Sequence, residues 1–370
     1  MSTLEADRSR LRDLDAQILE LKHSLSTLRT TKAQVQKRLD SYKYPVLTLP
    51  NEMVSEFFIH FLPAYPLCPP LTGRFSPMTL TQVCGAWRGK ALSTPSLWRA
   101  ISLSFHSDLP PLYQRHEADA WVRRSHSLPI AVEILDATSA NRSDNESEVL
   151  ATLAAHRACC EHLTVHLETA SVVALQGPMP RLRHLDLDFH YEHSGITDFS
   201  EAPLLRTVAL DYVAARMVLL PWAQITSLTL DVVSPMECDR LLRQTPNLTH
   251  CHLRIFVEDE GGDDGPPPDV TLAYLDSLTL VTVADPIPAV NGYLGTFIVP
   301  ALRRLKISED FLGSDPLALL ASFLSKSSCK LQDVDIGGER ILPECTYREA
   351  FPLITFSFEA EEVDSSSNSE

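Results

Sequence analysis

The sequence lacks the short motifs that mark nucleotide-binding and hydrolytic sites. It contains no GxxxxGK[ST] phosphate loop, no GxGxxG turn, no GxSxG nucleophile elbow and no HExxH metal helix. None of its carboxylate pairs lies in a motif that would mark a general acid and a general base. We therefore expect a protein without enzymatic activity, without catalytic residues and without a cofactor.

Positive charge and long apolar runs are also scarce. The 370 residues carry a formal net charge of −16, whereas a protein that binds phosphate groups needs a basic face. No stretch approaches the roughly 18 apolar residues of a membrane-spanning helix, and the N-terminus leads into no apolar signal segment. We expect an intracellular protein, cytoplasmic or nuclear or both, with no nucleic-acid or membrane partner. Basic peptides or proteins are its more natural ligands.

The eight cysteines are scattered and form no CxxC pair, which predicts free thiols in a reducing compartment. One cluster has spacing like that of a metal site: His156, Cys159, Cys160, His162 and His166. On a strand, however, His162 and His166 would point outward while Cys160 occupies a core position, so the set does not converge on one ion. We expect no metal site.

The stretch between residues 46 and 105 carries three helix-start signals, because Pro50, Pro77 and Pro95 each occupy a plausible first helical position. Apolar residues follow them at spacings of three and four, which predicts three short amphipathic helices. These residues are Met53, Val54, Phe57, Phe58, Phe61 and Leu62 after Pro50, and Leu80, Val83, Cys84 and Trp87 on one stripe after Pro77. About 40 helical residues are too few to bury so many aromatic rings, so we expect a partner protein to cover the remainder.

This stretch resembles the F-box, the motif by which substrate receptors dock on the Skp-type adaptor of SCF ubiquitin ligases. The resemblance lies in the order and spacing of LPxE, the paired phenylalanines, VCxxWR and PxLW. It implies a small helical domain over residues 44–104. The adaptor-binding residues it implies are Leu49, Pro50, Glu52, Phe57, Phe58, Leu62, Leu80, Val83, Cys84, Trp87, Leu97 and Trp98.

The F-box pattern is interrupted by a proline-rich insert at residues 63–77, where the usual F-box has a short turn. Inserts of this kind resemble those of a large fungal set of F-box proteins. Five prolines and one glycine predict a loop of limited flexibility. The insert is either an inert connection, a shield over the helices or a binding element.

Residues 4–42 carry a heptad repeat without proline or glycine. Its a positions are Leu4, Leu11, Ile18, Leu25, Lys32 and Leu39, and its d positions are Asp7, Leu14, Leu21, Leu28, Val35 and Tyr42. The pattern predicts a coiled-coil helix over residues 1–43 that needs a partner along one side. That partner is a second copy in a homodimer, or the helix folds back on its own chain. Pro45 should end the helix.

From residue 98 onward, one pattern of three apolar positions recurs about every 20 to 30 residues. Its clear occurrences are Cys160/Leu163/Val165, Leu182/Leu185/Leu187, Leu205/Val208/Leu210, Ile225/Leu228/Leu230, Leu248/Cys251/Leu253, Leu275/Leu278/Leu280, Leu302/Leu305/Ile307 and Leu331/Val334/Ile336. Degenerate versions are Trp98/Ile101/Leu103, Ser127/Ile130/Val132 and Phe351/Ile354/Phe356. One unit has too little apolar area to fold alone, so stacked units predict an α/β solenoid over residues 105–358. A parallel sheet should line its concave side, with short helices at 237–243 and 317–324 opposite.

This part resembles the leucine-rich-repeat class of F-box proteins, with one departure. The family usually carries Asn three residues after the last apolar position. Here these places hold His190, Val213, Val233, Phe256, Val283 and Asp310. Without that Asn ladder we expect irregular repeats.

The strand phase predicts which side chains line the concave face. If Leu185 and Leu187 point into the core, alternation sends His184, Asp186 and Asp188 to the opposite face. The same rule predicts one column across neighbouring strands, made of His166, Asp188, Asp211, Asp231 and Arg254. Like charges side by side in a sheet are unfavourable, so these acids either hold a basic segment of a target protein or are solvated strand-end residues.

Two acidic segments complete the chain, a loop at residues 258–269 and a disordered tail at residues 359–370. The resemblance implies a substrate-receptor subunit of an SCF-type cullin-RING ubiquitin ligase. The F-box would dock the Skp-type adaptor, and the repeat surface would bind an unknown target. The alternative is an interaction scaffold in which the F-box-like helices only cap the solenoid.

Overall fold

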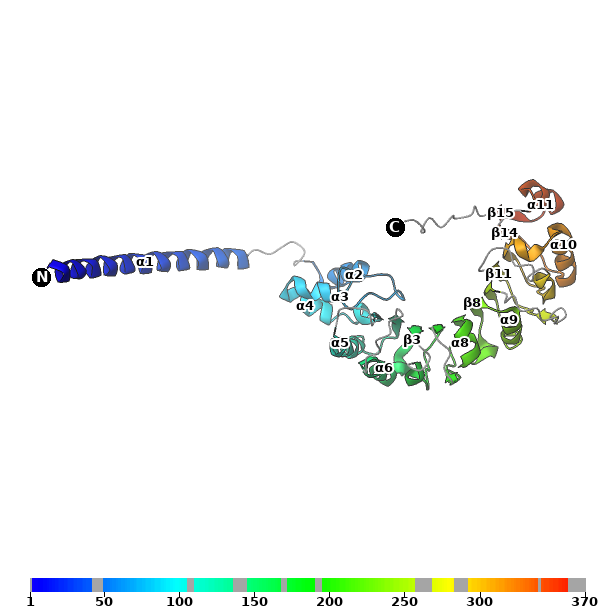
Figure 1. Cartoon of the computed structure of the whole chain (residues 1–370), viewed down its shortest axis with the longest axis horizontal. Coiled ribbons are helices and arrows are strands. Elements are labelled where there is room, and N and C mark those ends of the chain that lie inside the picture. Colours follow the sequence, from blue (N-terminus) through cyan, green and yellow to red (C-terminus); the bar gives the residue numbers. More distant parts are fainter. Residues whose placement is uncertain are drawn as a thin grey trace. The chain divides into compact units, whose positions relative to one another are not determined.

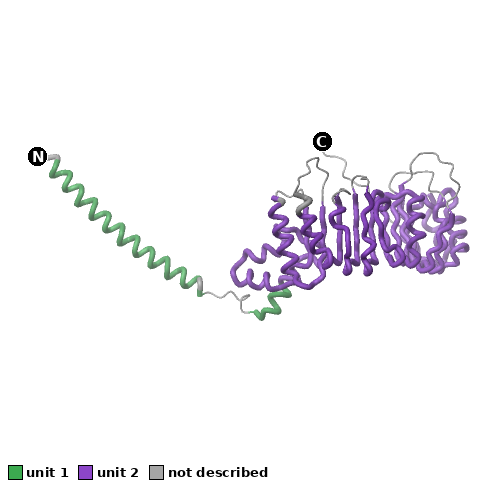
Figure 2. Tube along the Cα trace, turned by 90° about the horizontal axis from the view of Figure 1, so that it is seen from below, with its two compact units in different colours: residues 1–57 green, residues 58–370 purple. Residues whose placement is uncertain are grey.

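The computed structural model of the chain describes residues 2–41, 49–104, 110–135, 145–167, 172–189, 195–256, 268–282, 292–338 and 341–358. It forms two compact units, residues 1–57 and residues 58–370 (Figure 2). The predicted acidic loop lies outside the described residues except for Pro268 and Asp269, and the predicted tail lies outside them entirely. Pro45, His190 and Val283 lie outside them as well.

The first unit is dominated by α1 (Ser2–Ser41), a single helix of 40 residues and about 60 Å (Figure 1). The prediction of one long helix is confirmed. Every described side chain from residue 4 to residue 39 is exposed. A second helix, α2 (Asn51–Phe61), begins directly after Pro50 and ends inside the second unit.

The second unit continues with α3 (Pro77–Val83), α4 (Gly85–Leu92) and the 3-10 turn η2 (Pro95–Trp98). Pro77 begins α3 as predicted, whereas Pro95 begins a 3-10 turn of four residues in place of the predicted third amphipathic helix. The prediction of one helix running through Val83, Cys84 and Trp87 is wrong. Cys84 is extended, with φ −160° and ψ 170°, so α3 ends and α4 begins there, and the two helices do not share one continuous apolar stripe.

The predicted parallel sheet is confirmed. Within the described residues it has eleven strands, all parallel and arranged in chain order. Its strands are β1 (Ala100–Ser104), β2 (Ile130–Leu135), β3 (Cys160–Leu167), β4 (His184–Phe189), β6 (Thr207–Asp211), β8 (Ser227–Val233), β9 (His250–Ile255), β11 (Ser277–Thr282), β13 (Arg304–Ser308), β14 (Asp333–Gly337) and β15 (Thr355–Phe358). Two small parallel pairs lie apart from it, β5 (Thr197–Asp198) with β7 (Val218–Leu219) and β10 (Val270–Thr271) with β12 (Phe297–Ile298).

The register follows the repeated apolar positions. The second apolar residue of each clear unit lies opposite that of its neighbours, through Leu163, Leu185, Val208, Leu228, Cys251, Leu278, Leu305 and Val334. Two degenerate units have a different phase. Val132 and Phe356, expected at the third position, occupy the second, opposite Leu163 and Val334. A shift of two residues keeps a side chain on the same face, so sequence periodicity does not detect it.

Helices cover one face of the sheet, on the outer side of its curve (Figure 1). They are α5 (Pro111–Arg124), α6 (Asn145–His156), α8 (Tyr212–Met217), α9 (Pro235–Leu242), α10 (Pro316–Ser327) and α11 (Glu344–Ala350), with 3-10 turns η3 (Arg157–Cys159), η4 (Val173–Leu175), η5 (Trp222–Gln224), η7 (Tyr293–Thr296) and η8 (Glu309–Leu312). The helices expected at 237–243 and 317–324 correspond to α9 and α10. Leu187, Leu210 and Leu230 are among the buried residues of the strands.

The proline-rich insert packs on the N-terminal edge of the sheet. Pro70 forms a parallel bridge with Ser102 of β1, and the Ser102 backbone N–H donates to the Pro69 carbonyl at 3.0 Å. Leu71 and Ser76 are buried, and the Ser76 hydroxyl donates to the Leu71 carbonyl at 2.7 Å. The insert therefore belongs to the folded second unit and is more than a connection.

Candidate interaction surfaces

The predicted adaptor-docking residues differ widely in exposure. Leu49, Pro50, Glu52 and Phe57, in the first unit, are exposed, and Phe57 keeps 55% of its surface. In the second unit, Val83 is exposed, whereas Leu62, Cys84 and Trp87 are half-buried. Phe58, Leu80, Leu97 and Trp98 are buried. The exposed apolar side chains of this set are therefore Leu49, Phe57 and Val83, and these are the ones that a partner could contact most fully.

The buried members of this set pack among the short helices at the start of the second unit. The rings of Phe58 and Trp87 pack with centroids 4.9 Å apart. Trp98 donates from Nε1 to the Ala91 carbonyl at 2.9 Å and meets Trp121 edge-on at 5.3 Å. The guanidinium of Arg124 lies 4.5 Å from the centre of the Trp98 ring. Trp98 thus joins α4 and η2 to α5, and its side chain is buried among them.

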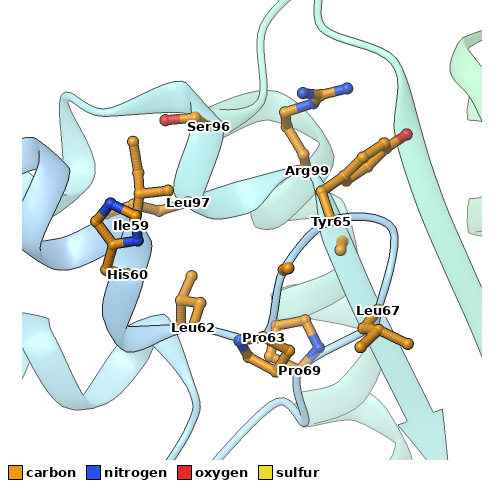
Figure 3. A pocket seen from close by; sticks show the side chains of 12 residues that line it. Ile59, His60, Leu62, Pro63, Tyr65, Leu67, Pro69, Ser96, Leu97 and Arg99 are labelled. Carbon is orange, nitrogen blue, oxygen red and sulfur yellow. The ribbon is translucent and has the colours of Figure 1, made fainter.

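A cavity of about 450 Å³ lies beside these helices, entirely within the second unit (Figure 3). Its walls come from the last turn of α2, the insert, η2 and the start of β1. The lining residues are Ile59, His60, Leu62, Pro63, Ala64, Tyr65, Leu67, Pro69, Ser96, Leu97, Arg99 and Ala100. Ile59, His60 and Leu97 lie on one side, and Tyr65, Leu67 and Arg99 on the other. Of the predicted docking residues, Leu62 and Leu97 contribute to its wall.

One wall of this cavity is held by a polar network that the sequence did not reveal. The Arg99 guanidinium lies 3.9 Å from the centre of the Tyr65 ring, and the Tyr65 hydroxyl donates to Glu161 at 2.8 Å. Burial, followed by this hydrogen bond to a carboxylate, raises the pKa of Tyr65. Glu161 also pairs with Arg183 at 3.2 Å. The network fixes the insert to β3 and gives the cavity a rigid rim.

A second hollow, of about 350 Å³, lies on the face of the sheet that the helices leave uncovered. It is lined by His166, Asp186, Leu187, Asp188, Ala209, Leu210, Asp211, Thr229, Asp231 and Arg254. Strand β4 alternates as predicted, because Leu185 and Leu187 are buried whereas His184, Asp186 and Asp188 are half-buried. His184 does not line the hollow; its ring lies 5.7 Å from that of His162.

The predicted column of polar residues forms in part. His166 lies opposite Asp188, and Asp211 lies opposite Asp231. Between β8 and β9 the register shifts after Leu230, so the regular spacing stops there. Arg254 nevertheless reaches Asp231 with a 2.6 Å ion pair. All five residues of the predicted column line the hollow, but the sequence pattern did not predict the shift in register.

Two of the acids in this hollow already have intramolecular partners. Asp211 accepts hydrogen bonds from the backbone N–H groups of Ala214 at 2.9 Å, Phe189 at 3.1 Å and Val213 at 3.2 Å. It therefore caps α8 and ties it to β4. Asp231 pairs with Arg254. Of the four acids that line the hollow, Asp186 and Asp188 take part in neither of these contacts.

Burial changes the proton affinity of the groups around the hollow. It raises the pKa of Asp186, and the nearby charges of Asp188 and Asp231 raise it further, against the opposing effect of two histidines. It also raises the pKa of Asp211, against the backbone hydrogen bonds that lower it. Burial lowers the pKa of His184, so its imidazole is neutral at pH 7. Four carboxylates and one guanidinium leave the hollow with a negative potential that favours a cationic group.

In the described part of the chain, no group of three or more His, Cys, Asp or Glu side chains is arranged to hold a metal ion. None of the helices described there combines the length and the apolar character of a membrane span. A scan against models of protein families finds no match for this sequence, and a search of curated proteins finds no match either.

Proposed function

We propose that this protein is a substrate-receptor subunit of an SCF-type cullin-RING ubiquitin ligase. In this proposal, residues 44–104 are an F-box that docks the Skp-type adaptor, and the second unit is an irregular leucine-rich-repeat solenoid that holds the target. The observation that carries the proposal is the exposure of large apolar side chains at motif positions. Phe57 is 55% exposed and Val83 is 57% exposed. Isolated exposed apolar residues are common, but here they coincide with the F-box pattern.

The proposed receptor performs no chemistry of its own. It holds a target close to a ligase, so that the local concentration of the target, and not an active site in this chain, determines the rate. The target would present a cationic segment to the hollow formed by β4, β6, β8 and β9, where Asp186 and Asp188 are its acidic contacts. The rest of the target surface would lie along the same face of the sheet.

The adaptor interface is tested with the full chain and a purified Skp-type adaptor. We expect Phe57→Ala combined with Val83→Ala to weaken binding by at least about tenfold, because exposed apolar anchors are typical hot spots. Neither side chain is part of the buried core, so the fold should be retained. The matched control is Leu353→Ala, which removes an apolar side chain that is 94% exposed near the C-terminal end of the sheet. Equal binding by all three chains would refute a role of Phe57 and Val83 in adaptor binding.

The scaffold alternative also has support from the structure. Trp98 is 1% exposed and packs on Trp121 and Arg124, which is the arrangement expected if the helices cap the end of the sheet. A folded chain that fails to bind the adaptor would favour the scaffold.

The target-binding face is tested separately with a fluorescent lysine-rich peptide. Asp186→Asn combined with Asp188→Asn should reduce its binding, and the remaining binding should depend less on salt. Asp333→Asn is the control, since Asp333 is an exposed acid on β14, away from the hollow. Unchanged peptide binding would show that the hollow does not hold cationic segments.

A further inference from the structure

Helix α1 exposes an apolar seam along its length. The a and d residues Leu4, Leu11, Leu14, Ile18, Leu21, Leu25, Leu28 and Val35 are between 40% and 69% exposed. Only two positions of the seam between residues 4 and 35 are not aliphatic, Asp7 at a d position and Lys32 at an a position. Both are exposed. These two charges restrict which partner, and which register, can cover the seam.

A parallel pair of α1 helices places identical residues opposite each other. Asp7 would face Asp7 and Lys32 would face Lys32, so two layers of the seam would hold like charges. In an antiparallel pair each a residue faces a d residue, and the register in which position numbers add to 39 brings Lys32 opposite Asp7. The remaining layers in that register are Leu4 with Val35, Leu11 with Leu28, Ile18 with Leu21 and Leu25 with Leu14.

We infer that α1 pairs with α1 of a second copy of this chain, antiparallel, over residues 4–35, with Lys32 of each copy opposite Asp7 of the other. Every layer is then either aliphatic on both sides or a pair of opposite charges. Moving the register by one heptad in either direction puts at least one of the two charges opposite leucine. The charges therefore fix both the direction and the register of the pair, which is the use of polar seam residues in coiled coils.

The charged residues that flank the seam do not clearly favour either the parallel or the antiparallel arrangement. In the antiparallel register Asp15 lies near Lys22 of the other copy, which is attractive, and Arg8 lies near Arg29, which is repulsive. The parallel pair would gain one attraction, between Arg10 and Asp15. Flanking side chains stay in water and are screened by salt, whereas seam side chains are partly desolvated, so the seam charges dominate. This inference does not depend on the proposed ligase function.

The first experiment uses the unaltered full chain. Light scattering measures its mass, and a zero-length carbodiimide cross-linker joins carboxylates to lysines that are in contact. Asp7 and Lys32 are separated by about 37 Å within one straight helix, so a cross-link between them must join two copies. We expect a dimer that yields the Asp7–Lys32 cross-linked peptide. A monomer, or a dimer without this peptide, would overturn the inference.

The second experiment exchanges the charges. Lys32→Asp alone, or Asp7→Lys alone, should weaken dimerisation by about tenfold, because each puts like charges into two symmetric layers. Both exchanges together should restore it. The controls are Lys37→Asp and Asp13→Lys, which make the same changes of charge on α1 away from the seam. A parallel dimer predicts no effect from either single exchange, because its like-charged layers remain like-charged, and that result would refute the antiparallel register.

Discussion

Replacing Asp211 tests whether this acid is a structural cap or a ligand contact. Its carboxylate accepts from three backbone N–H groups, two at the start of α8 and one, from Phe189, at the end of β4. Loss of an N-cap acceptor costs about 1 kcal/mol. Leaving the half-buried Phe189 N–H without its acceptor costs about 1 kcal/mol more. We therefore expect Asp211→Ala to lower the free energy of unfolding by about 2 kcal/mol.

The Asn variant separates the cap from the charge. Asp211→Asn keeps Oδ1, which accepts from Ala214 and Phe189, and it removes a carboxylate whose raised pKa shows that its charge is costly in this place. We expect a loss of less than about 1 kcal/mol. Urea unfolding at pH 7 measures both variants, and hydrogen exchange should show faster opening of Tyr212–Met217 in the Ala variant. Asp188→Ala, in the same hollow but at no helix start, is the control. An Ala variant as stable as the parent chain, or an Asn variant as unstable as Ala, would refute the capping role.

Three further changes test other contacts. Glu309 is 1% exposed, and its carboxylate accepts hydrogen bonds from the backbone N–H groups of Ile341 and Leu342 and from the Tyr347 hydroxyl. In urea unfolding, Glu309→Ala should therefore lower the free energy of unfolding by about 3 kcal/mol, whereas Tyr347→Phe should lower it by about 1 kcal/mol. Arg254→Met breaks the ion pair with Asp231, in which both side chains are over 40% exposed, and should change the free energy of unfolding by less than about 1 kcal/mol. A larger loss of stability would contradict the view that this pair is well solvated. Because the pKa of Asp186 is raised, its ionised form destabilises the fold fully above that pKa, and the penalty fades as pH falls towards the ordinary value of 3.8. Asp186→Asn should thus raise the melting temperature at pH 7 but not near pH 4.

The sheet could be predicted because each strand carries its own local signal. Leu163, Leu185 and Val208 alternate with polar residues, and period two fixes both the strand and the face it buries. Stacking such strands in chain order requires no long-range information. The same alternation identified Asp186 and Asp188 as residues of the uncovered face.

A local break in a helical pattern and contacts between distant residues could not be predicted. The break at Cys84 leaves the spacing of Leu80, Val83 and Trp87 unchanged, so a helical pattern continues across a residue that is extended. Asp211, at the end of β6, bonds to the backbone of both α8 and β4. In the sequence it cannot be distinguished from any other acid at the end of a strand. The interaction of Tyr65 with Arg99 and Glu161 joins the insert to the end of η2 and to β3, which lies far along the chain. An aromatic residue within a proline-rich loop was the one signal that this loop packs against something.

The bridge between Pro70 and Ser102 covers part of the β1 edge of the sheet, where another polypeptide strand could otherwise pair. An unpaired edge strand offers N–H and C=O groups on which another polypeptide can add itself, and repeated addition leads to fibres. The Ser102 N–H donates its hydrogen bond to the Pro69 carbonyl of the insert. Pro69 and Pro70 themselves have no backbone N–H group that could bond to a further strand. At Ser102, therefore, the insert occupies the edge of β1 and presents no backbone N–H donor to a further strand.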